Sequence, residues 1–189
     1  MLHLSQNEAA DQLISEDPLA LLIGLVLDQQ VPLERAFSAP LDLKERLGGR
    51  LDAEDIAAMD PEKLAAVFSA RPALHRFPAA NAKRVQELCR IVVDEYKGRP
   101  ATIWKKATSG DDLFRRLKAL PGFGEQKARI FVGFLGKQLG VQPTGWEDAA
   151  GRFGQPGTFF SIADIVDTAS LARVRAYKAQ IKAAAKSGA

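Results

Sequence analysis

The sequence predicts an all-α protein, and three observations carry that prediction. Apolar residues recur along almost the whole chain with the three-to-four-residue period of amphipathic helices. Aspartate, serine and proline stand where these periodic runs begin, and glycine follows several of them, as expected of helix caps. No window shows the sustained apolar–polar alternation of a half-buried strand.

Length and composition restrict the class of protein further. The 189 residues fit one large domain or two small lobes, and a net charge of +3 permits a nucleic-acid partner without requiring one. The single cysteine, Cys89, excludes an internal disulfide and any four-cysteine zinc or iron–sulfur site. No run approaches the roughly 18 apolar residues of a membrane span, and the acidic N-terminal segment does not resemble a signal peptide. We therefore expect a cytoplasmic monomer with no membrane contact.

Capping residues and prolines divide the chain into helices. Asp17-Pro18 pairs a capping side chain with a first-turn proline, and the apolar run to Leu27 predicts a central, buried helix. Pro32 starts the next helix, and we expect Pro40 to open a separate one that ends at Gly48-Gly49. Further helices are expected over residues 52–59, 60–68, 79–97, 146–150 and 170–186.

The stretch Leu117–Ala128 predicts a specific binding element. An amphipathic run leads into Leu-Pro-Gly-Phe-Gly (residues 120–124), and a second apolar run follows. Proline ends the first helix, and two glycines permit a tight turn that exposes backbone N–H groups at the start of the second. Lys127 stands in that first turn. The pattern indicates a helix-hairpin-helix that binds one phosphate of a nucleic-acid backbone; the alternative is an ordinary corner between two helices.

Three stretches, in this order, resemble the helix-hairpin-helix–GPD superfamily of base-excision DNA glycosylases, which includes endonuclease III and the 3-methyladenine glycosylases. They are residues 17–30, 81–93 and 120–128. The resemblance implies a two-lobed helical fold with a DNA-binding cleft, and double-stranded DNA containing a damaged base as the partner. We expect residues 18–135 to form the lobe that contains the hairpin, and residues 1–17 plus 136–189 to form the second lobe.

The chain departs from this family at three places. Bifunctional members carry a nucleophilic lysine where this chain has Gln126, so no β-lyase activity is expected. The cysteines of an iron–sulfur cluster are absent. The family's catalytic aspartate stands in a Val-Asp-Thr-His-like box about 18 to 20 residues after the lysine position, which here falls on Thr144-Gly145-Trp146. The nearest carboxylates are Glu147 and Asp148.

Base excision passes through an oxocarbenium-like state that a carboxylate can stabilise. Asp148 is our first candidate for that carboxylate and Glu147 the second; the alternative is that both cap a short helix or lie in solvent. Trp146 could stack on a flipped base, although a tryptophan in a glycine-rich segment can equally anchor a loop. The resemblance would place Asp28 in the same base pocket; the alternative is that Asp28 is a polar helix end. The expected DNA-binding residues are Gln29, Gln30, Pro121, Gly122, Phe123, Gly124, Gln126 and Lys127. For the two loop glutamines, the alternative is simple exposure to water.

The resemblance also implies a monovalent cation, Na⁺ or K⁺, held by the main-chain carbonyls of Lys118, Leu120 and Phe123; no other cofactor is expected. The function predicted from these observations is a monofunctional DNA glycosylase that hydrolyses the N-glycosidic bond of a damaged base. Two alternatives remain open. One is a non-catalytic helix-hairpin-helix protein that recognises damaged or branched DNA, and the other is an interaction protein whose hairpin is purely structural.

Overall fold

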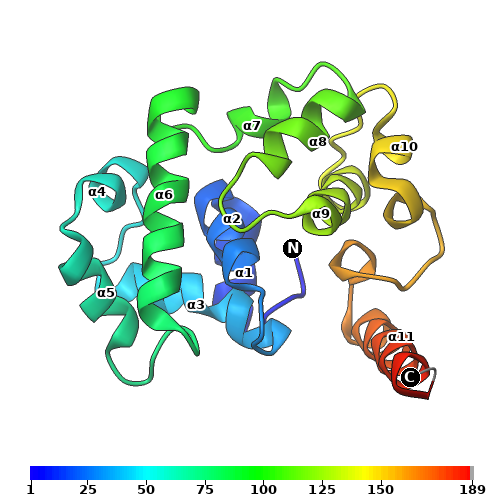
Figure 1. Ribbon diagram of the computed structural model, residues 1–189, viewed down its shortest axis with the longest axis horizontal. Helices are drawn as coiled ribbons and strands as arrows, with labels where there is room; N and C mark the ends of the chain where they lie inside the picture. The colour runs from blue at the N-terminus through cyan, green and yellow to red at the C-terminus, as the bar shows by residue number, and fades with distance from the viewer. Residues whose placement is uncertain (188–189) are drawn as a thin grey trace. The chain divides into compact units, whose positions relative to one another are not determined.

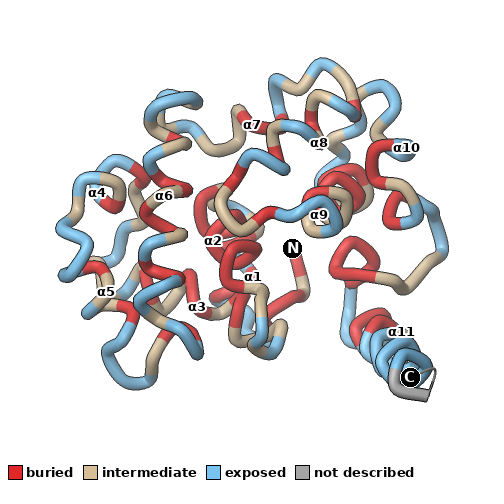
Figure 2. The backbone as a smooth tube through the Cα atoms, viewed as in Figure 1, coloured by how far each residue is buried: buried red, intermediate tan, exposed pale blue. Residues whose placement is uncertain are grey.

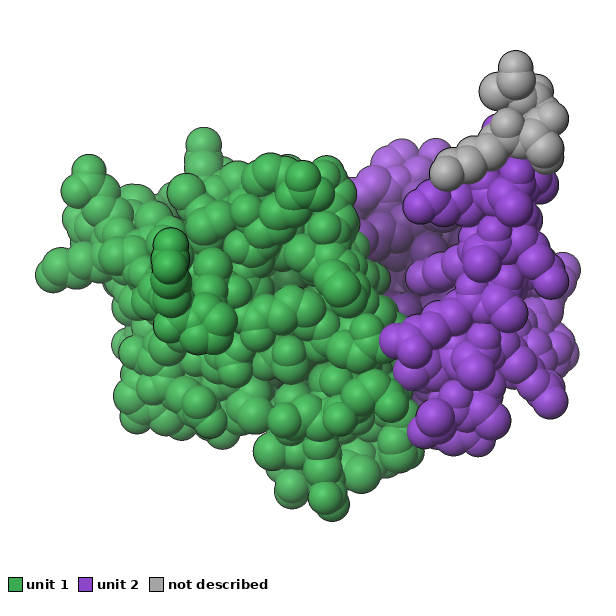
Figure 3. Space-filling view, turned by 90° about the horizontal axis from the view of Figure 1, so that it is seen from below, with its two compact units in different colours: residues 1–103, 120–122 green, residues 104–119, 123–189 purple. Residues whose placement is uncertain are grey.

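The computed structural model describes the backbone of residues 1–187 and the side chains of residues 1–185. Every regular element in this part of the chain is a helix, which confirms the all-α prediction. The chain forms two compact units, coloured in Figure 3. Unit 1 comprises residues 1–103 and 120–122, and unit 2 comprises residues 104–119 and 123–189. None of the described helices is long and apolar enough to span a membrane.

Unit 1 is built around a buried central helix. Every residue of α2 (Pro18–Leu27) after its first is buried, and α2 packs against α1 (Glu8–Glu16), α3 (Leu33–Arg46) and α6 (Pro78–Tyr96) (Figures 1 and 2). α6 also packs against two shorter helices, α4 (Ala53–Ala58) and α5 (Pro61–Ser69). A helix with no polar face is stable only inside a core, so the composition of α2 fixes its central place.

The capping signal at Asp17-Pro18 in unit 1 is realised as the sequence predicts, whereas the helix start expected at Pro40 is not. Asp17 accepts hydrogen bonds from the N–H groups of Leu19 and Ala20, and Pro18 occupies the first turn. Pro40, however, does not open a separate helix, and that prediction is wrong: it lies buried inside α3. Packing of α3 against α1 and α2 compensates for the backbone hydrogen bond that proline cannot make.

Unit 2 is organised around α9 (Glu125–Gln138). This helix packs against α8 (Gly110–Lys118), α10 (Trp146–Ala150) and two 3₁₀ turns, η1 (Gly151–Gly154) and η2 (Ile162–Asp164). The last helix, α11 (Thr168–Ser187), packs on η2. A single helical turn, α7 (Thr102–Lys105), lies where the chain passes from unit 1 to unit 2.

Glycine allows the elements of unit 2 to approach closely. A Cβ atom at Gly110 would collide with the backbone of Gly145, and one at Gly136 would collide with the ring of Trp146. α10 therefore packs against α8 and α9 through close contacts that a larger residue at Gly110 or Gly136 does not permit.

The contact units are divided differently from the lobes expected from the sequence. α1 packs on α2 and α3 within unit 1, while both hairpin helices, α8 and α9, belong to unit 2. The cleft between two lobes stays a prediction. Cys89 lies fully buried in α6, and burial raises the pKa of its thiol to about 12.

Candidate nucleic-acid interface

The turn of the hairpin depends on one glycine in a left-handed conformation. Gly122 has a φ of +78°, a region that residues with a Cβ atom adopt only with strain. Its carbonyl oxygen accepts a hydrogen bond of 3.0 Å from the Gln29 side-chain Nε2. The turn between α8 and α9 is thus fixed both by its own backbone and by the loop that follows α2.

The second hairpin helix begins without a side-chain cap. Its N-cap residue is Gly124, whose φ of −75° and ψ of 175° are open to any residue type. A Cβ atom at Gly124 would meet nothing within 4 Å. Neither backbone conformation nor internal packing therefore requires glycine here. The first turn of α9 is left with amides that no capping side chain satisfies, next to open space, which is the arrangement that binds an anion.

Charged and aromatic side chains flank this helix start. The Lys127 ammonium lies 5.8 Å from the centroid of the Phe123 ring, within the range of a cation–π contact. Phe123 is itself buried, so the contact positions the Lys127 ammonium group close to the first turn of α9. Gln126, at the position of the family's lysine, is exposed.

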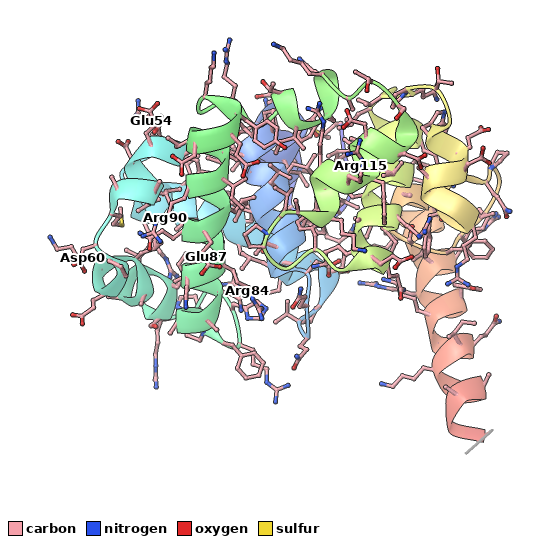
Figure 4. All side chains as sticks on the ribbon, turned by 45° about the horizontal axis from the view of Figure 1, so that its top comes forward. Glu54, Asp60, Arg84, Glu87, Arg90 and Arg115 are labelled. Carbon is pink, nitrogen blue, oxygen red and sulfur yellow. The ribbon has the colours of Figure 1, made fainter. Side chains whose placement is uncertain are left out.

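The two loop glutamines have different environments. The Gln29 amide is engaged within the protein: beyond its bond to Gly122, its Oε1 accepts a long hydrogen bond of 3.4 Å from Arg84, which projects from α6 (Figure 4). Gln30 is exposed and has a φ of +57°. The structure therefore gives Gln29 a role in positioning the turn, whereas Gln30 is the glutamine whose side chain faces solvent.

A buried histidine in the segment before α6 is bonded to the loop that contains Gln29. His75 is 4 % exposed, and its Nδ1 accepts hydrogen bonds from the backbone N–H of Phe77 (3.0 Å) and from Asn81 Nδ2 (2.7 Å). The ring proton must then lie on Nε2, which donates to the Gln29 carbonyl at 2.9 Å. Burial lowers the pKa of His75, and the nearby positive charges of Arg84 and Arg35 lower it further. Sequence analysis missed this residue, because nothing local distinguishes it from a loop histidine.

Sequence analysis also missed Phe77. It is 44 % exposed although it is a large apolar side chain, and it directly precedes the first residue of α6. The Arg76 guanidinium lies 5.2 Å from its ring centroid. The sequence does contain a signal for this residue, because Phe77 stands between Arg76 and Pro78, the proline that starts α6. The backbone N–H of Phe77 is bonded to His75, and His75 is bonded to Gln29, so these bonds connect the residue with the exposed ring to the loop after α2.

A depression in unit 2 lies beside the start of α9. Its volume is about 470 Å³, and its lining residues are Glu125, Gln126, Arg129, Ala150, Gly151, Arg152 and Phe153. Arg129 is fixed by a 3.0 Å ion pair with Glu125, a 3.0 Å hydrogen bond to the Ala149 carbonyl, and a position 4.9 Å from the Phe114 ring centroid. The size is within the range of about 300–1,000 Å³ typical of ligand pockets.

The structure places the two predicted catalytic carboxylates next to this depression rather than in it. Glu147 and Asp148 are exposed and line a second depression of about 420 Å³, which shares Gly151 and Arg152 with the first. The carboxylate that does line the Gln126 depression is Glu125. It was not a sequence candidate, because no spacing argument pointed to the residue directly before the lysine position.

The two predicted base-pocket residues occupy separate units. Trp146 packs its ring against Gly136 of α9 and so serves as an anchor for α10. It also lines a third depression of unit 2, of about 450 Å³. Asp28, half-buried, ends α2 with its backbone N–H bonded to the Leu25 carbonyl. A contact of either residue with a base stays a prediction.

The main-chain carbonyls of Lys118, Leu120 and Phe123 are the groups expected to hold a monovalent cation. A monovalent cation bound to these carbonyls stays a prediction. Among the described residues, no group of three or more His, Cys, Asp or Glu side chains could hold a metal ion.

The glycine turn and the uncapped start of α9 lie between the two helices of the predicted helix-hairpin-helix, and phosphate binding there stays a prediction. The family model described as HhH-GPD superfamily base excision DNA repair protein matches residues 23–187, and the chain belongs to this family. The resemblance drawn from the three sequence stretches is thereby confirmed. Comparisons with curated proteins and with solved structures give no match.

Proposed function

We propose that this protein is a monofunctional DNA glycosylase, acting as a cytoplasmic monomer on double-stranded DNA that contains a damaged base. The observation that carries the proposal is the start of α9. Gly124 leaves open space over an uncapped helix N-terminus, and the next turn borders a depression that holds Gln126 in place of lysine. Phosphate binding at the first feature would place DNA beside the second. A monovalent cation on the carbonyls of Lys118, Leu120 and Phe123 would add positive charge at the turn.

Three carboxylates are available to stabilise the sugar cation. Asp148 remains our first choice, since it is exposed and, within the described residues, bound in no ion pair. Glu147, the neighbouring residue, is likewise exposed and, within the described residues, bound in no ion pair. Glu125 lines the Gln126 depression itself, but its carboxylate is paired with Arg129 at 3.0 Å. An ion-paired carboxylate is already partly neutralised, which makes it a weaker partner for a developing cation.

The absence of lysine at position 126 supports hydrolysis without strand cleavage. A glutamine amide cannot form a Schiff base with the sugar, so borohydride should trap no covalent adduct on an abasic-site duplex. The matched control is Lys127→Ala. An adduct in the parent protein that disappears in this variant would show that Lys127 is a nucleophile and that the enzyme is bifunctional.

A panel of duplexes tests the activity. Each duplex carries one lesion (uracil, 3-methyladenine, hypoxanthine, 8-oxoguanine or an adenine mispair), and products are scored as alkali-labile abasic sites. On the best substrate, Asp148→Asn should lower the single-turnover rate by about 10²–10³, the usual size of such an electrostatic contribution. Glu147→Gln and Glu125→Gln are the matched controls. Loss of activity in Glu125→Gln alone would move the catalytic carboxylate to the Gln126 depression.

One observation favours a second candidate, a DNA-binding protein without catalysis. The Gln126 depression contains a single carboxylate, Glu125, and that carboxylate is ion-paired. The second candidate predicts tight binding to a lesion duplex, or to branched DNA, with no abasic product from any duplex of the panel.

A further inference from the structure

The first half of α11 contributes buried side chains, whereas its residues 178–185 are exposed. Leu171 and Val174 are each 2 % exposed, and the helix packs on η2. One turn later, the centroid of the Tyr177 ring lies 4.8 Å from the centroid of the Phe160 ring. From residue 178 to residue 185 every side chain is exposed, as the pale outer half of the helix shows in Figure 2. α11 thus continues as a rod beyond the 3₁₀ turn that buries its start (Figure 1).

The charge of this helix is unlike that of the rest of the chain. Residues 168–187 contain no aspartate or glutamate, and their basic residues are Arg173, Arg175, Lys178, Lys182 and Lys186. The rest of the chain has 21 basic and 23 acidic residues, a net charge of −2. The whole positive excess of the protein therefore lies on one helix. The side chain of Lys186 is outside the described residues; Lys178 and Lys182 are described and exposed.

Two features of the outer half identify its partner. Lys178 and Lys182 are spaced i, i+4, so they lie on one face of the helix with their Cβ atoms about 5–6 Å apart, and both can contact the phosphates of one DNA strand. Alanine fills four of the eight positions from 178 to 185, which favours a helical conformation in an exposed segment and lets a polyanion approach closely. Ile181, 52 % exposed, is the sole bulky apolar side chain between residues 178 and 185. A membrane-surface helix needs a broad apolar face, which this segment lacks.

We propose that the outer half of α11 is a second DNA-binding element, separate from the hairpin, that contacts the phosphate backbone without reading sequence or damage. It rests on the proposed function only in taking duplex DNA as the partner. Contacts of this kind hold an enzyme near DNA while it moves between sites, because they are purely electrostatic and easily exchanged. Excision itself does not require them.

The test is the salt dependence of binding to an undamaged duplex. The double variant Lys178→Gln/Lys182→Gln keeps helix propensity and removes two charges. Its plot of log Kd against log salt concentration should lose about 1.8 units of slope, at about 0.9 per phosphate contact. The matched control is Lys105→Gln/Lys106→Gln, which removes two exposed charges from α7 and its following residue. The single-turnover excision rate at saturating protein should be unchanged in both variants.

The outcomes separate this proposal from the proposed function. An unchanged slope in the α11 variant, or an equal loss in the control, would overturn the second binding element even if excision is found. A selective loss of slope supports it even if no lesion in the panel is excised. A second measurement, sedimentation with vesicles of an anionic phospholipid, tests whether the partner of this helix is a membrane surface. Vesicle binding that depends on Lys178 and Lys182, together with an unchanged slope on DNA, would overturn the proposal in favour of a membrane surface.

Discussion

The side-chain amide of Gln29 is bonded to the main-chain carbonyl of Gly122, 93 positions further along the chain, at 3.0 Å. The same amide accepts from Arg84, and the carbonyl of Gln29 accepts from His75. Gln29 therefore links the loop after α2 to the turn of the hairpin, and it is itself bonded to Arg84 within α6 and to His75 before α6.

Gln29→Glu tests this link, because a carboxylate cannot donate to the Gly122 carbonyl. We expect the free energy of unfolding to fall by about 1–3 kcal/mol, the cost of an unsatisfied carbonyl, and duplex affinity to fall with it. Gln30→Glu adds the same charge one residue away, where the side chain is exposed, and should reduce affinity alone. Equal melting temperatures for the two variants, measured by circular dichroism, would contradict a positioning role for Gln29.

The two glycines of the hairpin should respond differently to alanine. Gly122→Ala places a Cβ atom at a φ of +78° and should destabilise the protein by about 1–2 kcal/mol. Gly124→Ala meets neither strain nor a neighbour, so stability should be kept or slightly raised. Its added methyl group nevertheless occupies the space over the start of α9, and duplex affinity should fall. Full affinity in a stable Gly124→Ala protein would show that no phosphate approaches there.

Phe77→Ala tests whether the exposed ring enters the base stack beside a lesion. The ring is 44 % exposed, so its removal should cost little stability. We expect the ratio of lesion to undamaged affinity to fall several-fold, because unstacking a base is easier when an apolar side chain fills the gap. Leu139→Ala is the matched control, at an apolar side chain that is 39 % exposed at the end of α9. A similar loss in both variants would assign the effect to general surface changes.

His75 predicts a pH dependence with a definite sign. Its pKa is lowered in the folded protein, chiefly by burial, so the unfolded chain takes up the proton first. The neutral ring's contribution to stability is complete above the ordinary pKa of 6.5 and is lost as the pH falls below it. The free energy of unfolding should therefore decrease between pH 6.5 and about 5, where carboxylates with ordinary pKa values stay ionised.

His75→Gln is the matched variant, since a glutamine amide can still donate to the Gln29 carbonyl but does not titrate. Denaturant unfolding over the same pH range should give a flatter profile than the parent protein gives. The chain has one other histidine, His3, which is kept in both proteins and cannot produce a difference between them. Identical slopes would remove His75 as the source of the dependence.

Local signals account for what the sequence could predict. Asp17-Pro18 and Ser109 cap the helices that follow them, because capping depends on residues two or three positions apart. The hairpin was recognisable for the same reason, since its proline, glycines and lysine are contiguous. Pro40 shows where local reasoning fails. Its local pattern predicts a helix start, but the packing of α3 against its neighbours keeps this proline inside the helix.

The candidate site could be predicted only in part, because its residues are brought together by tertiary structure. Gln29 was identified, but its amide is engaged with Gly122, a partner that no spacing rule connects to it. Asp148 was chosen by counting from Gln126, yet the two line separate, adjoining depressions. Glu125 becomes a candidate catalytic carboxylate only because it lines the same depression as Gln126, which the sequence does not show.

The burial of Cys89 has a practical consequence for measuring this protein in motion. A thiol with a pKa of about 12 is almost entirely protonated at neutral pH, and reagents react with the thiolate. The natural cysteine can therefore stay in place while a second one, such as Ala179→Cys on the exposed part of α11, takes a fluorophore. Energy transfer to a dye at one end of a duplex would then report the arrival and departure of that helix on single DNA molecules.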